Sequence, residues 1–399
     1  MQELLDRIIA SRGWTAEGTV ELVYFAGMLF FAVALLLVVV TPFTGIVSWV
    51  ERRVAARMQS RVGPNRVGPQ GILQWVADGL KCILKEDLIP EDADRVLFVA
   101  APYLVFSGLF GAFAVLPFSE HLVIADLDVG AFYVMAITSL VPLGIIMSGW
   151  ASNNKWSLLG GMRSAAQIIS YEIPGALSLL SVILAAGTLS LQGIIRAQGW
   201  NPADWFLFRN PFLFAGFFFF FIANLAEGNR TPFDLPEAES ELVAGYSTEY
   251  SGMRFAFFML AEWANLYVVG SIVNVAFLGG WNVPPVAEGV LLTILQIAVF
   301  AAKSLALVFV IIWIRWTLPR LRVDQMMLLC WKYLVPLSFL NVLGTAVWMM
   351  VVPEGSAAGR VASWLLVLLG LSLLVLLGLR VRMNLKEAGV ERLDLKWIA

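Results

Sequence analysis

The chain has 399 residues, of which 59% are hydrophobic, and its formal net charge is −2. Soluble domains are about 45–50% apolar, so the composition indicates an integral membrane protein, and so small a net charge does not suggest a nucleic-acid partner. One histidine and two cysteines are too few for a bis-histidine haem or a four-cysteine iron–sulfur cluster, so we expect no haem, no iron–sulfur cluster and no metal site, and any electrons must come from another subunit.

Nine apolar stretches are long enough to cross the ~30 Å hydrocarbon core of a membrane as helices. The predicted spans are 22–48, 96–118, 130–149, 160–187, 207–226, 254–278, 288–314, 326–352 and 361–379. Neither an internal repeat nor a soluble domain is evident. The sequence therefore predicts an all-α, polytopic transmembrane helix bundle that forms a single membrane domain over residues 1–399.

Lysine and arginine are unevenly distributed among the loops. Eight lie in the loop after the first span, three follow the seventh span and five lie in the C-terminal tail, whereas loops 119–129 and 279–287 have none. Because basic loops stay on the cytoplasmic side, we expect the N-terminus outside and the C-terminus in the cytoplasm.

The first cytoplasmic loop, 49–95, contains a helix that does not span the membrane, predicted over 70–88. Its apolar residues share one face at helical spacing: Ile72, Leu73, Val76, Leu80, Ile83 and Leu84. Such a helix lies in the membrane interface. The preceding stretch "ERRVAARMQSRVGPNRVG" is explained equally by positive-inside anchoring and by a surface that docks a partner protein.

Three ionisable residues lie at comparable depth inside predicted spans: Glu172, Glu262 and Lys303. A charge at mid-bilayer costs about 2.5–3.5 kcal/mol on insertion scales. Either these residues form structural ion pairs between helices, or they form a proton or ion path. Pro174 lacks an N–H, so the carbonyl of Ser170 loses its helical partner and this part of the fourth span should be polar.

The acidic cytoplasmic loop 227–253 follows the fifth span and contains "LAEGNRTPFDLPEAESELVAG" at its start. Its "DLPE" segment resembles a capping box with Asp234 as the N-cap and Glu237 at the third helical position. That interpretation does not account for Glu227, Glu239 or Glu241. Clustered carboxylates repel one another and exchange protons near neutral pH, so the alternative is a proton-exchanging site.

Four blocks of the sequence carry a family resemblance: "ERRVAARMQSRVGPNRVGPQGILQWVADGLK", "SAAQIISYEIP", "LAEGNRTPFDLPEAESELVAG" with "LAEWAN", and "RWTLPRLRVDQMM". They resemble the H-type membrane subunit of bacterial respiratory complex I and its mitochondrial equivalent, NADH dehydrogenase subunit 1. The ninth span, 361–379, is absent from the mitochondrial form, which suggests a bacterial chain.

The resemblance implies a component of a proton-translocating NADH:quinone oxidoreductase in the bacterial cytoplasmic membrane. Such a component carries no redox cofactor of its own, takes quinone as substrate, and contacts the hydrophilic quinone-site and cluster-bearing subunits as well as neighbouring membrane-arm subunits. The quinone-tunnel positions of the family correspond to Glu51, Arg52, Arg61, Asp78, Lys81, Arg230, Asp234 and Arg320. Its acidic funnel, thought to couple quinone reduction to proton translocation, corresponds to Glu172, Glu227, Glu237, Glu239, Glu241 and Glu262.

The residues themselves add Glu249 and Lys303 to the predicted proton-coupling set. Two other functions stay open at this point: the membrane subunit of a related membrane-bound hydrogenase, and a stand-alone ion transporter that uses Glu172, Glu262 and Lys303. Secondary transporters usually contain two repeated halves, and co-purification with a large assembly would distinguish a complex subunit from a transporter.

Overall fold

The computed structural model describes residues 19–235, 239–284, 289–352 and 356–387, and within these ranges the chain forms helices and loops without a strand. The all-α prediction is therefore confirmed for the described residues. The chain divides into two compact units, Met1–Leu80 and Lys81–Ala399.

The first unit contains α2 (Thr19–Met58), a helix of 40 residues. The predicted first span ended at residue 48, but α2 continues because neither glycine nor proline occurs between Ile46 and Met58. Residues 49–58 are therefore helical rather than part of a loop. The chain turns just after this helix, where Ser60 has a φ of 55°.

A short helix follows in the sequence where the amphipathic one was predicted. Residues Pro69–Gly71 form a 3-10 turn, η1, and α3 extends over Gln74–Leu84, so the helix is present but shorter than the predicted 70–88. The side chains of Leu80, Ile83 and Leu84 are exposed, as expected for a helix whose apolar face contacts the membrane interface.

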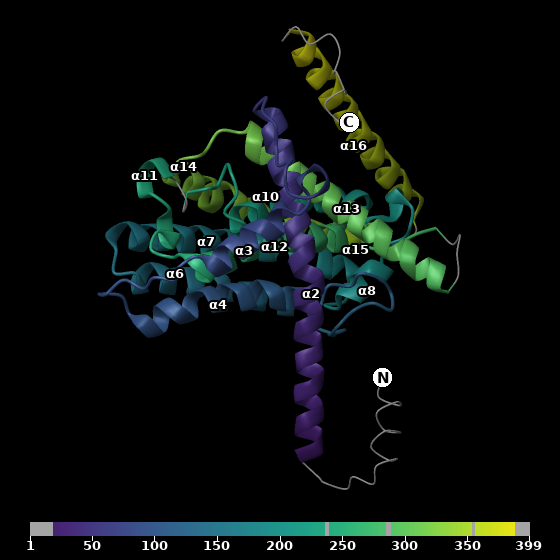
Figure 1. Cartoon of the computed structure of the whole chain (residues 1–399). Coiled ribbons are helices and arrows are strands. Elements are labelled where there is room, and N and C mark those ends of the chain that lie inside the picture. Colours follow the sequence, from purple (N-terminus) through teal and green to yellow (C-terminus); the bar gives the residue numbers. More distant parts are fainter. Residues whose placement is uncertain (1–18, 236–238, 285–288, 353–355, 388–399) are drawn as a thin grey trace. The chain divides into compact units, whose positions relative to one another are not determined.

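The second unit consists of helices and short helical turns. In chain order they are α4 (Arg95–Phe113), α5 (Gly130–Thr138), α6 (Leu140–Ala151), α7 (Lys155–Ala186), α8 (Leu191–Arg196), η2 (Pro202–Asp204), α9 (Phe206–Arg209), α10 (Pro211–Glu227), α11 (Glu239–Leu242), η3 (Gly245–Ser247), α12 (Gly252–Phe277), α13 (Val290–Thr317), α14 (Val323–Leu328), η4 (Leu329–Leu334), α15 (Val335–Val351) and α16 (Ala357–Glu387). Helices α4, α6 and α7 lie side by side (Figure 1).

Seven stretches of the described chain are long and apolar enough to cross a membrane, and α10 is a shorter apolar helix. Together with α2, they correspond to the nine predicted spans. Three of these spans are interrupted. The third divides at Ser139 into α5 and α6, and the eighth contains the π-helical segment η4. The fifth begins only at Pro211, because Asn210 caps α10 by accepting a hydrogen bond from the Phe212 N–H at 2.9 Å.

The loops of the second unit gather at two ends. At one end, Arg254 at the start of α12 pairs with Asp87 at 3.2 Å. At the other end, Asn282, just after α12, donates to the carbonyl oxygen of Ile195 at 2.8 Å. We call the first the acidic end, because it contains the described part of the acidic loop 227–253, which we call the acidic stretch. We call the second the far end. Helices that cross a membrane one after another place their connecting loops at the two ends in turn.

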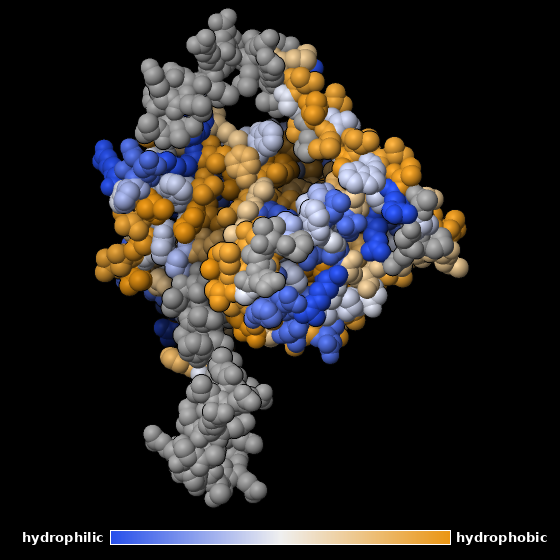
Figure 2. Space-filling view, turned by 90° about the vertical axis from the view of Figure 1, so that its right-hand side faces the viewer, coloured by the Kyte–Doolittle hydropathy of each residue, from blue (hydrophilic) through white to orange (hydrophobic). Residues whose placement is uncertain are grey.

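Small and polar residues allow the helices to approach closely. A Cβ atom at Gly160 of α7 would lie 2.6 Å from Cα of Gly245, so only glycine fits there. Between α12 and α13, Asn274 Nδ2 donates to Ser304 Oγ at 3.3 Å. Both features are typical of helix packing within membranes. On the face shown in Figure 2, polar side chains gather in patches between extensive apolar areas, as expected of a surface that contacts lipid.

Candidate functional site

One buried amide holds the segment after α10 against α7. Gln167 of α7 is fully buried, and its Nε2 donates to the carbonyl oxygens of Ala226 and Phe233, both at 2.7 Å. Between them, Asn229 adopts a φ of 50°, a left-handed conformation that asparagine tolerates better than most residues. The start of the acidic stretch is therefore fixed in place by α7.

The centre of the site is a buried ion pair between two helical segments. Arg230 follows α10, Glu262 lies in α12, and Nε of Arg230 is 3.0 Å from Oε1 of Glu262. The side chains are only 2% and 13% exposed. Charges removed from water in this way interact strongly, and removing one partner leaves the other buried without compensation. The interior of the bundle thus connects directly to the acidic stretch through this pair.

A second ion pair joins two loops at the acidic end. Nη2 of Arg320 is 3.1 Å from Oδ2 of Asp234, and the Asp234 side chain is 12% exposed. Next to it, the backbone N–H of Leu321 donates to the carbonyl oxygen of Pro232 at 3.0 Å. The loop before α14 and the segment after α10 are therefore held together, which places three predicted tunnel residues, Arg230, Asp234 and Arg320, in one region.

Glu227 ends α10 and faces the interior. It lines a small cavity of ≈ 10 Å³ together with Asn224 and Asn265. The Thr138 hydroxyl is within hydrogen-bonding reach of its carboxylate, and Glu172 of α7 lies close enough to interact with it electrostatically. The volume is about that of one water, and Thr138, Asn224, Glu227 and Asn265 are the polar residues of an otherwise apolar lining.

The thiol of Cys330 replaces the helical partner that Pro174 removes. Its Sγ donates to the carbonyl oxygen of Ser170 at 3.1 Å, and both cysteines of the chain are free. One residue further along α7, the Tyr171 hydroxyl donates to the carbonyl oxygen of Met326 at 3.0 Å. The polar segment predicted near Pro174 is therefore the place where the π-helical span packs on α7.

The outer acids of the stretch have separate partners. Glu241 pairs with Arg163 of α7 at 2.7 Å, and Glu249 accepts from Asn154 Nδ2 at 2.6 Å. Glu237 lies outside the described residues, as does the side chain of Glu239 at the start of α11. The predicted capping box depends on Glu237 and stays a prediction for the same reason.

Lys303 lies apart from the other two ionisable residues of the predicted spans. Its Nζ donates to the carbonyl oxygens of Leu278 at 2.7 Å and Gly280 at 3.1 Å, and lies 4.5 Å from the ring centre of Trp205. Leu278 follows Glu262 by 16 residues, or ~24 Å along a helix. The expectation of comparable depth was wrong, because the middle of α13, where Lys303 lies, packs beside the end of α12 that is farthest from the acidic end. Its role in coupling stays a prediction.

The predicted tunnel residues of the first part of the chain also form local pairs. Arg52 of α2 makes an ion pair with Asp78 of α3. Nε of Arg61 donates to Oε1 of Gln59 at 2.7 Å. The two other members of this group are helical: Glu51 in α2 and Lys81 in α3.

Gln167, Thr138 and Cys330 are among the residues of the site that were not predicted. The sequence did contain a signal for the first, because a lone amide in the apolar run of the fourth span must find hydrogen-bond partners inside the bundle. For the other two, only the packing of separate helices reveals the contact.

Helices of membrane length, loops at two ends and buried ionisable pairs define a polytopic helical membrane protein with charged groups in its interior. A model of the NADH dehydrogenase family matches residues 31–346. The chain belongs to this family.

Several curated relatives are similar over most of their length, and each is named as the H subunit of an NADH-quinone oxidoreductase. The one from Anaeromyxobacter dehalogenans is 52% identical over 355 residues, which cover 84% of this chain and 86% of the relative. The one from Geobacillus kaustophilus is 52% identical over 322 residues, 80% of this chain and 93% of the relative. The one from Chlorobium luteolum is 50% identical over 312 residues, which cover 76% of this chain and 84% of the relative.

Proposed function

We propose that this chain is the membrane subunit of a proton-translocating NADH-quinone oxidoreductase, in which it forms part of the quinone tunnel and couples quinone reduction to proton translocation. The names of its relatives support the first statement. The family and these names favour it over a hydrogenase component or a stand-alone transporter.

The buried pair of Arg230 and Glu262 carries the proposal for coupling. Arg230 belongs to the proposed tunnel wall and Glu262 to the proposed acidic funnel, and their side chains are 3.0 Å apart. A change of charge at the quinone changes the electrostatic potential at Arg230, and in a buried pair that change acts on Glu262 with little screening. One ion pair thus connects the two functions.

Further along the proposed funnel, Glu227 and Glu172 interact within the bundle. Reduction of a quinone takes up two protons, so the electrostatic balance among these carboxylates changes during turnover. We assign Glu237, Glu239, Glu241 and Glu249 to the cytoplasmic entrance of the funnel, where Arg163 and Asn154 bind the last two.

The electrons reach the quinone from a cluster-bearing partner subunit, because this chain has too few histidines and cysteines to hold the usual redox centres. We assign the chain to the bacterial cytoplasmic membrane, with the acidic end towards the cytoplasm, the N-terminus outside and the C-terminus inside. The distribution of lysine and arginine supports this orientation.

The test of coupling is to replace Glu262→Gln and Glu227→Gln in the assembled complex. Each replacement removes a proton-exchanging group while keeping its shape, so we expect quinone-linked turnover and proton pumping to fall together, by about tenfold or more. Both rates are measured per assembled complex in proteoliposomes.

Asp87→Asn is the matched control, because Asp87 also pairs with an arginine at the acidic end but is outside the proposed funnel. It should leave both rates within a factor of about two. Normal rates in both Gln variants would remove the coupling role and leave structural ion pairs as the explanation.

The tunnel assignment is tested separately by Asp78→Asn. Asp78 pairs with Arg52, so its loss releases a guanidinium of the proposed tunnel wall. We expect the KM for quinone to rise several-fold with an unchanged amount of assembled complex, and an unchanged KM would contradict the assignment.

A further inference from the structure

A second cavity lies at the far end of the second unit, the end that also contains Lys303. Its volume is ≈ 480 Å³, within the usual range of ligand sites. It is lined by the ends of α7, α8, α9 and α15, by η2, and by the first two turns of α10 and α16. Helix α16, which supplies one wall of this cavity, lies beyond the stretch 31–346 that the family model matches.

Three arginines line the cavity, Arg196, Arg209 and Arg360, against one acid, Asp204, among the described lining residues, while Glu120 pairs with Arg196 from outside the lining. Such an excess of positive charge suits an anionic group, and the planar, forked guanidinium binds phosphate oxygens in pairs.

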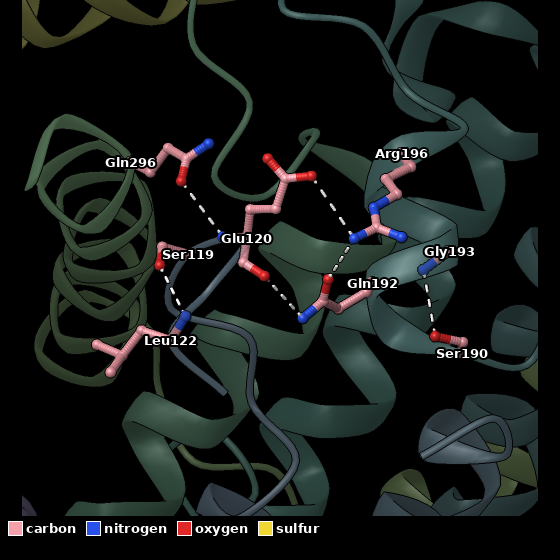
Figure 3. A network of polar contacts seen from close by, with 8 residues as sticks. All are labelled: Ser119, Glu120, Leu122, Ser190, Gln192, Gly193, Arg196 and Gln296. Atoms are coloured by element: carbon pink, nitrogen blue, oxygen red, sulfur yellow. Dashed lines mark hydrogen bonds and ion pairs between the residues drawn. The ribbon is translucent and has the colours of Figure 1, made fainter. Parts of the chain in front are cut away.

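Arg196 is held in place by its neighbours (Figure 3). Its Nη2 lies 3.6 Å from Oε1 of Glu120 and donates to Oε1 of Gln192 at 3.1 Å. Gln192 Nε2 in turn donates to the carbonyl oxygen of Glu120 at 3.3 Å, and Gln296 Oε1 accepts from the Glu120 N–H at 3.2 Å. The guanidinium is therefore pre-positioned, yet the Arg196 side chain is still 57% exposed.

The other two arginines differ in their contacts within the protein. Nη1 of Arg209 donates to the carbonyl oxygen of Ala197 at 3.3 Å. Arg360, in the first turn of α16, is exposed, and within the described chain its guanidinium has no hydrogen-bond or ion-pair partner. Its donors are available for a ligand.

Apart from Gln198, Asn210 and Ser363, the rest of the lining is apolar. Trp348, Met349 and Val352 of the α15 end and Leu213 of α10 belong to it. Helix α16 contacts α9 and η2, but side chains along its length such as Leu365 and Leu368 stay largely exposed. Apolar side chains beside three arginines match a phospholipid, whose charged head lies at the interface and whose acyl chains extend into the membrane.

We propose that this cavity binds an anionic phospholipid, with its phosphodiester held by Arg196, Arg209 and Arg360 and its acyl chains against α15 and α16. The lipid then links α16 to the bundle, because its headgroup bridges arginines of α8 and α9 to an arginine of α16. This site does not depend on the proposed quinone or coupling function.

The test measures phosphatidylglycerol retained per complex, by mass spectrometry of extracted lipid after detergent washing and titration with phosphatidylglycerol. Variants Arg360→Gln and Arg209→Gln remove one charge-assisted hydrogen-bond donor group each, so we expect about tenfold weaker retention in each. Arg380→Gln is the matched control, since Arg380 is exposed on the same helix but 20 residues away, and its retention should equal that of the unchanged chain.

Two further binding measurements identify the chemical class of the ligand. Phosphatidylcholine, whose phosphate is balanced by a cation, should bind about tenfold more weakly, and soluble glycerol 3-phosphate should not displace the lipid at similar concentration. If glycerol 3-phosphate competes equally, the ligand is a free phosphate and the lipid proposal is wrong. Equal phosphatidylglycerol retention in the Arg360→Gln, Arg209→Gln and unchanged complexes also overturns it, and would fit a neighbouring subunit filling the cavity. If Arg360→Gln reduces assembly, Arg360→Lys, which keeps the charge, should restore both assembly and lipid.

Discussion

The inner and outer parts of the acidic stretch contain the same kinds of charged group but differ in their surroundings. In the inner part, Arg230 is 2% exposed and pairs with Glu262, which is 13% exposed. In the outer part, Glu241 is 58% exposed and pairs with Arg163, which is 33% exposed. Water screens the outer pair, whereas the inner pair has exchanged water for protein. Burial therefore decides how much each carboxylate contributes to stability.

The largest effect is expected from Arg230→Leu, which leaves the Glu262 carboxylate buried without its partner. Removing one member of a buried pair costs about 3–5 kcal/mol. We expect much less chain in membranes and a lower temperature at which half of the tagged chain becomes insoluble.

The double variant Arg230→Leu/Glu262→Leu should recover much of that loss, since it removes both charges. Arg254→Leu serves as the control, because its partner Asp87 is 38% exposed and remains partly hydrated. Equal losses of stability in Arg230→Leu and Arg254→Leu would show that burial does not make the Arg230–Glu262 pair more important for stability than the Arg254–Asp87 pair.

A smaller effect is expected from Gln167→Leu. This change keeps the apolar bulk but leaves the buried carbonyl oxygens of Ala226 and Phe233 without the donor that Gln167 supplies, at a cost of about 1–3 kcal/mol. We expect faster hydrogen–deuterium exchange in residues 228–235, where α7 no longer holds the segment.

Gln198→Leu is the matched control for this experiment. Gln198 is a buried amide of the far end that donates to the carbonyl oxygens of Ile194 and Val275. It should lower stability to a similar extent without changing exchange in residues 228–235. Unchanged exchange in the Gln167→Leu variant would mean that other contacts hold the start of the acidic stretch.

The smallest effect is expected from Arg163→Gln, which breaks the exposed pair with Glu241. Exposed pairs contribute about 0.2–1 kcal/mol, so thermal stability should change by no more than a degree or two. In the unchanged chain, the contribution of this pair to stability should decrease as the salt concentration is raised. A loss comparable to that of Arg230→Leu would place Glu241 in an environment as buried as that of Glu262.

The sequence by itself determined the class of the protein, its membrane helices and its family. Span length is set by bilayer thickness and composition, and neither depends on which helices become neighbours. The same holds for the missing helical partner of the Ser170 carbonyl, which follows from Pro174 alone. The four sequence blocks identified the family before any helix was placed.

Only the tertiary structure decided which charges meet. Arg230 and Glu262 are 32 residues apart and Asp234 and Arg320 are 86 apart, so no helical periodicity relates them. The same applies to the Cys330 thiol on the Ser170 carbonyl and to the place of Lys303 at the far end. Local spacing fixes only which residues share a face of one helix, whereas an ion pair between helices depends on how those helices pack and where each one begins and ends.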